Sequence, residues 1–111
     1  MTDKIVVMVT CASQSEAKKI ARAVVKARLA ACANVMVSPV LSIYRWKGKV
    51  ETAKEVLLLV KSTRKRFSGL EREIRRLHSY DTPEIIAVAL VDGSKAYLQW
   101  IEESVAVNSK R

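Results

Sequence analysis

The segment at residues 56–60 reads VLLLV, an unbroken run of aliphatic residues near the middle of the chain. Side chains of a β-strand point alternately to the two faces of a sheet, so a strand with one wet face alternates apolar and polar residues. This segment is apolar at every position, and the same holds for IVVMV at residues 5–9 and IIAVAL at residues 85–90. The pattern therefore predicts a sheet that is covered on both faces.

A chain of 111 residues has too few helical segments to cover both faces of such a sheet. A large exposed patch of Val, Leu and Ile would make a monomer prone to aggregate. We therefore expect the second face to be buried against other copies of the same chain. The strand expected at residues 50–61 is also unusually long, and its outer part can form an arm that pairs with a neighbour. The alternative is a bulged strand that folds back within the monomer.

Around this segment the pattern predicts strand, helix, strand, strand, helix, strand and helix. The strands are expected at residues 4–11, 33–37, 41–46, 50–61 and 84–91, with a Gly-containing hairpin connection at residues 47–49. The helices are expected from a capping box at Ser13 and Glu16 to near Leu29, over residues 64–78 with Thr63 as the cap, and after residue 94.

This βαββαβ order is typical of the α+β class. It favours a ferredoxin-like sandwich, in which helices cover one face of an antiparallel sheet, with an extra C-terminal helix. We expect one domain over residues 1–111, with a frayed tail at residues 108–111. The spacing of apolar residues predicts the core stripe of the second helix. This stripe is Phe67, Leu70, Ile74 and Leu77, and the last helix is expected to carry Tyr97, Trp100 and Ile101 on one face.

The composition is that of a folded and strongly basic protein. Hydrophobic residues make up 50% and charged residues 28%, which argues against intrinsic disorder. The apolar runs are far shorter than the ~20 residues that a membrane helix needs, and the opening MTDK begins no secretory signal. Two cysteines make no disulfide framework, so we expect a cytoplasmic protein. The net charge of +9 attracts anions but identifies no partner.

Several short segments occur in an order that resembles the CutA divalent-cation tolerance family. They are LAACAN (29–34), YRWKGK (44–49), EVLL (55–58), KST (61–63), LHSYDTPEI (77–85) and YLQW (97–100). The resemblance extends from Ile5 to Val105 and implies a ferredoxin-like subunit that assembles as a homotrimer. It also implies a role in tolerance of copper and other divalent metals, with copper binding in some members, and no established enzymatic activity.

The candidate metal-coordinating residues are Cys11, Cys32 and His78. We expect them to bind copper or another divalent ion, and we expect no required cofactor. The family's copper-associated cysteine lies near the end of the first strand, where this chain has Cys11. No Cys-x-x-Cys or His-x-x-x-His pair occurs, which argues against a preorganised zinc site. The structural alternatives are that the cysteines act as small buried hydrophobes and that a His78 imidazolium interacts with a helix C-terminus.

A second candidate site is a ligand cleft between subunits. Its expected residues are Trp46 from a neighbour's hairpin together with Lys61, Tyr80 and Glu84, beside His78. Such a cationic, aromatic-lined cleft would take a small anion, or a metal with its counter-ligand.

The alternative function is the binding of nucleic acid or another polyanion by a basic helix. The residues that would carry it are Arg64, Lys65, Arg66, Arg72, Arg75 and Arg76. The central strands offer aliphatic rather than aromatic side chains, so sequence-specific RNA recognition is not expected. A third hypothesis is a purely structural trimeric scaffold. The chain has one histidine, no Gly-rich phosphate loop and no Gly-x-Ser-x-Gly motif, so we expect no enzymatic activity.

Overall fold

The computed structural model describes residues 2–106, in which five strands and three helices follow one another. The strands are β1 (Lys4–Cys11), β2 (Cys32–Val35), β3 (Val40–Trp46), β4 (Lys49–Thr63) and β5 (Ile85–Ala89). The helices are α1 (Gln14–Lys26), α2 (Phe67–Leu77) and α3 (Lys95–Val105), and a short 3-10 turn at Arg64–Arg66 leads into α2. The predicted order of elements is therefore confirmed. The expected tail at residues 108–111 lies outside the described residues.

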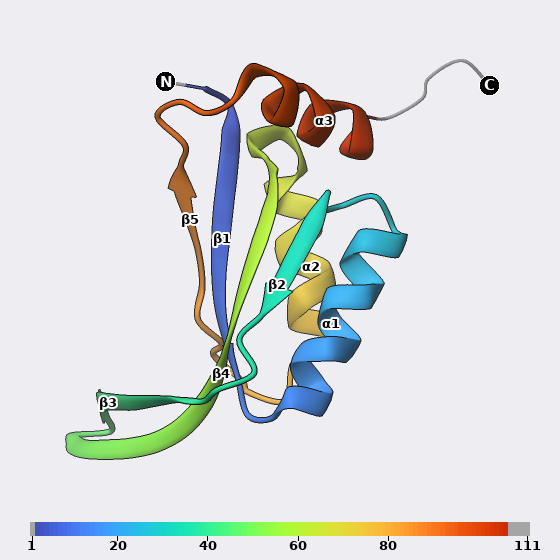
Figure 1. Cartoon of the computed structure of the whole chain (residues 1–111). Coiled ribbons are helices and arrows are strands. Elements are labelled where there is room, and N and C mark those ends of the chain that lie inside the picture. Colours follow the sequence, from blue (N-terminus) through green and yellow to red (C-terminus); the bar gives the residue numbers. More distant parts are fainter. Residues whose placement is uncertain (1, 107–111) are drawn as a thin grey trace.

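Four of the strands form the main sheet in the order β2-β4-β1-β5, and all neighbouring strands are antiparallel. Helices α1 and α2 lie on one face of this sheet, whereas α3 crosses one of its ends (Figure 1). The fold is thus the predicted mixed α/β arrangement with an antiparallel sheet. None of the helices in residues 2–106 is long and apolar enough to cross a membrane.

Strand β4 is 15 residues long and takes part in both the main sheet and a separate hairpin. Its second half pairs with β1, and its first half pairs with β3 in a hairpin arm that projects from the body (Figure 1). Lys47 and Gly48 form the tip of this arm with φ values of 51° and 80°, as a tight two-residue hairpin turn requires. The strand runs without interruption, so the predicted arm is present and the chain does not fold back as a bulged strand.

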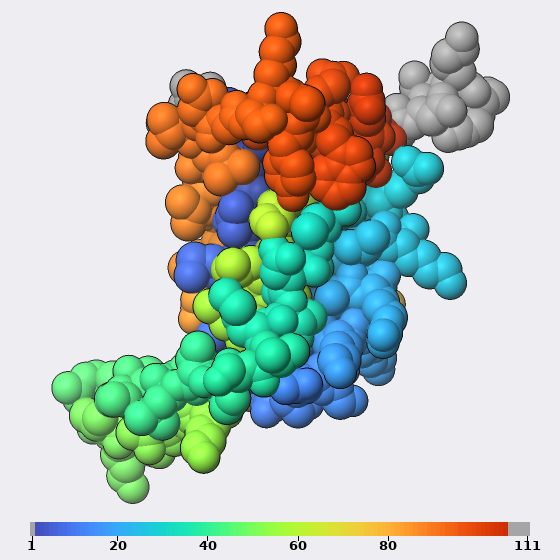
Figure 2. All heavy atoms as spheres, in the orientation of Figure 1, coloured from blue at the N-terminus to red at the C-terminus, as the bar shows by residue number. Residues whose placement is uncertain are grey.

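The two faces of the main sheet differ in what covers them. Val7, Val9, Leu58 and Val60 point toward the helices and are fully buried with the apolar stripes of α1 and α2. On the opposite face, Ile86 and Val88 of β5 are each 50% exposed, and their neighbours on β1 and β4 are half-buried. Figure 2 shows these strands at the surface between α3 and the hairpin arm, without a helix over them. One chain therefore covers only one of its two apolar sheet faces. The half-buried neighbours are Val6, Met8, Leu57 and Leu59.

Three local predictions differ from the structure. Helix α1 ends at Lys26 rather than near Leu29, because Arg28 adopts a φ of 60° and turns the chain back toward β2. The Thr63 side chain makes no capping hydrogen bond, and a 3-10 turn lies between Thr63 and the start of α2. In α3 the buried residues are Ile101 and Val105, whereas Tyr97 and Trp100 are exposed and contact each other, with ring centroids 5.3 Å apart. Of the three residues expected to share one face, only Ile101 is buried.

Glu16 connects the start of α1 to the loop that follows α2. The predicted cap is present, because the Ser13 hydroxyl accepts a hydrogen bond from the Glu16 amide at 3.1 Å. The Glu16 carboxylate accepts from the amide of Ala12 at 3.0 Å and from the amide of Ser79 at 2.6 Å. One side chain therefore holds the end of β1 and the end of α2 in a fixed relation.

We expect Glu16→Gln to lower the free energy of unfolding by ~1–2 kcal/mol at pH 7, because a charged acceptor of two amides becomes neutral. Burial raises the pKa of Glu16, but the hydrogen bonds from Ala12 and Ser79 outweigh it, so the net pKa lies below its ordinary value of 4.5. A lowered folded-state pKa stabilises the protein above pH 4.5, and that contribution is lost as the pH falls through the folded-state pKa.

Urea denaturation of wild type and variant at several pH values measures this difference. Glu103→Gln on α3 is the matched control, because Glu103 accepts a hydrogen bond only from an exposed neighbour, Gln99. Equal effects of the two substitutions, or a Glu16→Gln effect that persists unchanged at low pH, would contradict the assignment.

Candidate functional site

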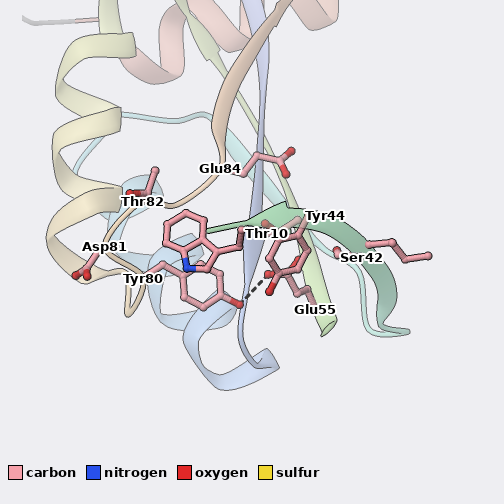
Figure 3. A pocket seen from close by; sticks show the side chains of 10 residues that line it. Thr10, Ser42, Tyr44, Glu55, Tyr80, Asp81, Thr82 and Glu84 are labelled. Carbon is pink, nitrogen blue, oxygen red and sulfur yellow. Dashed lines mark hydrogen bonds between the residues drawn. The ribbon is translucent and has the colours of Figure 1, made fainter. Parts of the chain in front are cut away.

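The predicted site residues converge where β1 ends and the hairpin arm leaves the body. Thr10 and Cys11 are the last residues of β1 and pair with Leu57 and Val56 of β4. Glu55 is the residue of β4 just before Val56, so it lies beyond the point where β1 ends. The loop after α2, residues 78–84, closes over this point (Figure 3).

His78 ends α2 and is buried against the end of β1. Its Nε2 lies 2.8 Å from the carbonyl oxygen of Thr10, which can only accept a hydrogen bond. Its Nδ1 accepts a hydrogen bond from the Tyr80 amide at 3.1 Å. These partners assign a neutral ring with the proton on Nε2. His78 therefore positions a loop against a strand, and the imidazolium predicted to interact with the helix C-terminus does not fit this hydrogen bonding.

Two of the three predicted metal ligands lie together. The Cys11 sulfur, a Glu16 carboxylate oxygen and a His78 ring nitrogen all lie within 4.8 Å of one another, and no other such group of three occurs within residues 2–106. Cys32 does not belong to it, because its sulfur lies 4.0 Å from the Lys61 ammonium on another part of the sheet. Glu16 was missed as a possible ligand because its sequence context explains it fully as a helix cap.

The electrostatics of this metal-ligand group are those of a protonated thiol beside a neutral ring. Cys11 is fully buried, and burial, reinforced by the charges of Glu16 and Glu55, raises the pKa of its thiol to about 12. The donor atoms are one sulfur, one nitrogen and one carboxylate oxygen, a set that suits copper and other borderline divalent ions. Both ring nitrogens of His78 and both oxygens of Glu16 already have hydrogen-bond partners, so a metal ion would compete with these contacts.

Three of the predicted cleft residues line one pocket of about 570 Å³. Trp46 comes from the chain's own hairpin arm. Tyr80 and Glu84 come from the loop after α2 (Figure 3). Lys61 is not among the lining residues, because it lies further along β4, where its ammonium contacts Cys32 and the side-chain oxygen of Asn34. Within one chain the pocket therefore lacks the positive charge of Lys61, on which the predicted cationic character depends. The remaining lining residues are Thr10, Ser42, Ile43, Tyr44, Glu55, Asp81 and Thr82.

Glu55 and Tyr80 form the back of this pocket. The Tyr80 hydroxyl donates a hydrogen bond to Glu55 Oε2 at 2.7 Å, and the Tyr80 and His78 rings are 4.7 Å apart. Burial and this hydrogen bond raise the pKa of Tyr80 well above its usual range, so the phenol stays a neutral donor. Glu55 was missed because it lies where the polar arm meets the apolar strand, and the sequence offers no sign that it faces a cavity.

The basic residues of the polyanion hypothesis are spread along α2 rather than gathered on one surface. Arg72, Arg75 and Arg76 line a hollow of about 580 Å³ near the end of α2. Arg66 instead donates a hydrogen bond to the carbonyl of Val105 at 2.7 Å. Arg64 lines a separate hollow beside the sheet, and Lys65 is exposed next to it. The hypothesis stays a prediction, and three of its six residues share a surface.

Comparison with known proteins covers nearly the whole chain. The family model described as CutA1 divalent ion tolerance protein matches residues 5–104. The divalent-cation tolerance protein CutA of Thermus thermophilus is 44% identical over 99 residues, which is 89% of this chain and 95% of that protein. Human Protein CutA is 43% identical over 95 residues, which is 86% of this chain, and the match spans 52% of the human protein.

Solved structures lead to the same family. The crystal structure of CutA from Xylella fastidiosa superposes with a TM-score of 0.90 at 36% identity, over 94% of this chain and 99% of that one. A structure of the Thermus thermophilus protein also gives a TM-score of 0.90, at 42% identity over 93% of this chain and 99% of that chain. Sequence and fold agree over the segments that form the sheet, the arm and the loop after α2. This chain belongs to the CutA1 divalent ion tolerance family.

Proposed function

We propose that this protein is a homotrimer of ferredoxin-like subunits that acts in tolerance of divalent metal ions by binding a copper-type ion weakly, without catalysing a reaction. The observation that carries the metal part is the convergence of Cys11, Glu16 and His78 within 4.8 Å. The names of the relatives, which refer to divalent cations, support the same role. Both cysteines are free thiols, which fits a reducing compartment, so the cytoplasm stays our proposed location.

The open face of the sheet supports the trimer. Ile86 and Val88 are half exposed there, and burial of apolar surface stabilises an assembly by ~25 cal/mol per Å² removed from water. The hairpin arm adds further apolar surface, since Ile43 and Val50 are 66% and 65% exposed although they belong to regular strands. Neighbouring copies that cover both surfaces would remove the aggregation liability of the single chain.

The weakness of metal binding follows from the state of the ligands. A thiolate binds metal, so the Cys11 thiol, with its pKa of about 12, must lose a proton first. The ion must also displace at least one hydrogen bond of His78. We therefore propose a site that binds transiently at elevated metal concentration, rather than a resident metal that the fold needs.

We expect Cys11→Ser to weaken copper binding at least tenfold, because the sulfur ligand is lost. Cys32→Ser is the matched control and should leave the affinity unchanged, since Cys32 lies apart from the group. Wild-type affinity should rise about tenfold per pH unit between about pH 6 and 8, as one proton is released on binding. Competition titration with a chromogenic chelator measures all three. Unchanged affinity in Cys11→Ser, or a loss confined to Cys32→Ser, would contradict the proposed site.

We expect Ile86→Lys to dissociate the trimer, because it places a charge in the centre of the proposed interface. Val25→Lys is the control, since Val25 is comparably exposed but lies on α1, on the covered side of the sheet. Sedimentation velocity should show slower sedimentation for Ile86→Lys and wild-type behaviour for Val25→Lys. If Ile86→Lys sediments as wild type and retains its circular dichroism, the open face is not the interface.

A further inference from the structure

The helix layer presents a basic surface on the side of the molecule opposite to the open sheet face. Helices α1 and α2 pack against each other on one face of the main sheet (Figure 1). Their buried stripes point toward the sheet, so their other sides point away from it. The proposed trimer turns the open sheet faces toward neighbouring copies, which leaves the helix layer of each chain on the outside. A partner can therefore reach this surface in the single chain and in the assembly alike.

The basic residues of α1 form one line along the helix. Lys19, Arg22 and Lys26 are spaced by three and four residues, so they share one side of the helix. This side lies opposite to the buried stripe, and all three side chains are exposed. Lys26 follows Lys19 by seven residues, a distance of ~10 Å along the helix at ~1.5 Å per residue.

Helix α2 continues this surface with arginines. Arg72 and Arg75 lie on the side opposite to its buried stripe, and both are exposed. Arg76 lies next to them, but its guanidinium pairs with the Glu73 carboxylate at 2.7 Å, which offsets its charge. The other outward-facing cations of the two helices have no carboxylate of residues 2–106 within ion-pair distance. We call these five the basic helix face: Lys19, Arg22, Lys26, Arg72 and Arg75.

The basic helix face suits an extended polyanion better than a small anion. The hollow of about 580 Å³ at the end of α2 also contains Glu71 and Asp81, so its charge is mixed. The five cations are instead spread over two packed helices, whose axes lie ~8–10 Å apart. A nucleic acid duplex carries one phosphate charge per ~1.7 Å of its axis, which is about six charges over ~10 Å. The two surfaces therefore match in extent and in charge density.

The other side chains of this layer distinguish between polyanions. Single-stranded nucleic acid binds by stacking its bases on aromatic rings, but Phe67, the aromatic residue of α1 and α2, is packed against the core. Helices that bind anionic membranes insert apolar side chains into the lipid, and Val25 is the only large apolar residue exposed on these two fully described helices. A duplex needs neither feature, because its phosphates are on the outside.

We propose that the basic helix face binds the phosphate backbone of duplex nucleic acid without recognising its sequence. The lysine and arginine side chains pair with phosphates and release the counterions that surround the duplex, which drives binding. This function is separate from metal binding and requires neither the metal-ligand group nor the open sheet face. It also changes the set of residues predicted from the sequence. The 3-10 turn at Arg64–Arg66 is not part of the face, whereas α1 contributes three of its five cations.

Fluorescence anisotropy of the wild-type protein with a labelled duplex of ~20 base pairs, over a series of salt concentrations, tests the proposal. Five phosphate contacts predict a slope of about −4.5 for log K against log salt, and thus a roughly 500-fold loss of affinity between about 50 and 200 mM. A duplex of different sequence should bind equally well. Single-stranded DNA of the same length, and vesicles of phosphatidylcholine with phosphatidylserine, should bind more weakly. Absence of duplex binding at about 50 mM salt, a slope of about −2 or shallower, or tighter binding of the single strand or the vesicles would overturn the proposal.

Paired substitutions assign the binding to the two helices. Lys19→Gln with Lys26→Gln removes two of the five cations, so we expect the slope to become shallower by about 2 and the affinity at about 50 mM salt to fall at least tenfold. Arg72→Gln with Arg75→Gln should have the same effect, because both helices contribute to one surface. All four residues are exposed, so the circular dichroism of the variants should match that of the wild type.

Lys65→Gln with Lys95→Gln is the matched control. This pair removes the same charge from exposed positions outside the two helices, and it should leave the slope unchanged. An equal loss of affinity in the control would show that only the net charge matters, and wild-type affinity in either helix pair would show that the helix does not contact the duplex. Either result would refute the assignment.

Discussion

The antiparallel pairing of β1 with β4 is the constraint on which the rest of the structure depends. The register places Val7 opposite Val60 and Val9 opposite Leu58 on the helix side, and it places Met8 opposite Leu59 on the open side. A slip of one residue would exchange the two faces along the whole strand. Because both faces are apolar, the pairing creates one core within the chain and a second surface that one chain leaves open. The trimer that we propose is a consequence of this register.

The same register separates the two candidate sites. At the end of β1, Cys11 points to the helix side, toward Glu16 and His78, whereas Thr10 and Glu55 face the pocket on the other side. The loop after α2 joins them, because the His78 ring binds the Thr10 carbonyl and the next residues complete the pocket. A soft-metal group and an acidic aromatic pocket thus lie back to back across one strand end.

The sequence predicted the features that depend on the local spacing of apolar residues. It did not predict which residues from distant segments meet in one pocket. The doubly apolar strands, the hairpin arm and the stripe of Leu70 and Ile74 in α2 follow from periodicity, and all are present. Within one chain, Lys61 and Tyr80 do not line the same pocket, for a geometric reason. Lys61 and Glu55 are six residues apart on one strand, a separation of ~20 Å at ~3.3 Å per residue, so only one can reach the pocket. Glu55 lines the pocket and Lys61 does not, so within one chain the pocket carries negative charge. No sequence motif indicates which of the two residues reaches it.

The most direct test of the account is the mass of the wild-type protein in solution, measured by light scattering over a wide range of dilution. The account predicts a species of about 37 kDa, three times the 12.4 kDa of one chain, that persists on dilution because it buries the open face of each sheet. A protein that stays at 12.4 kDa and soluble even when concentrated would contradict it.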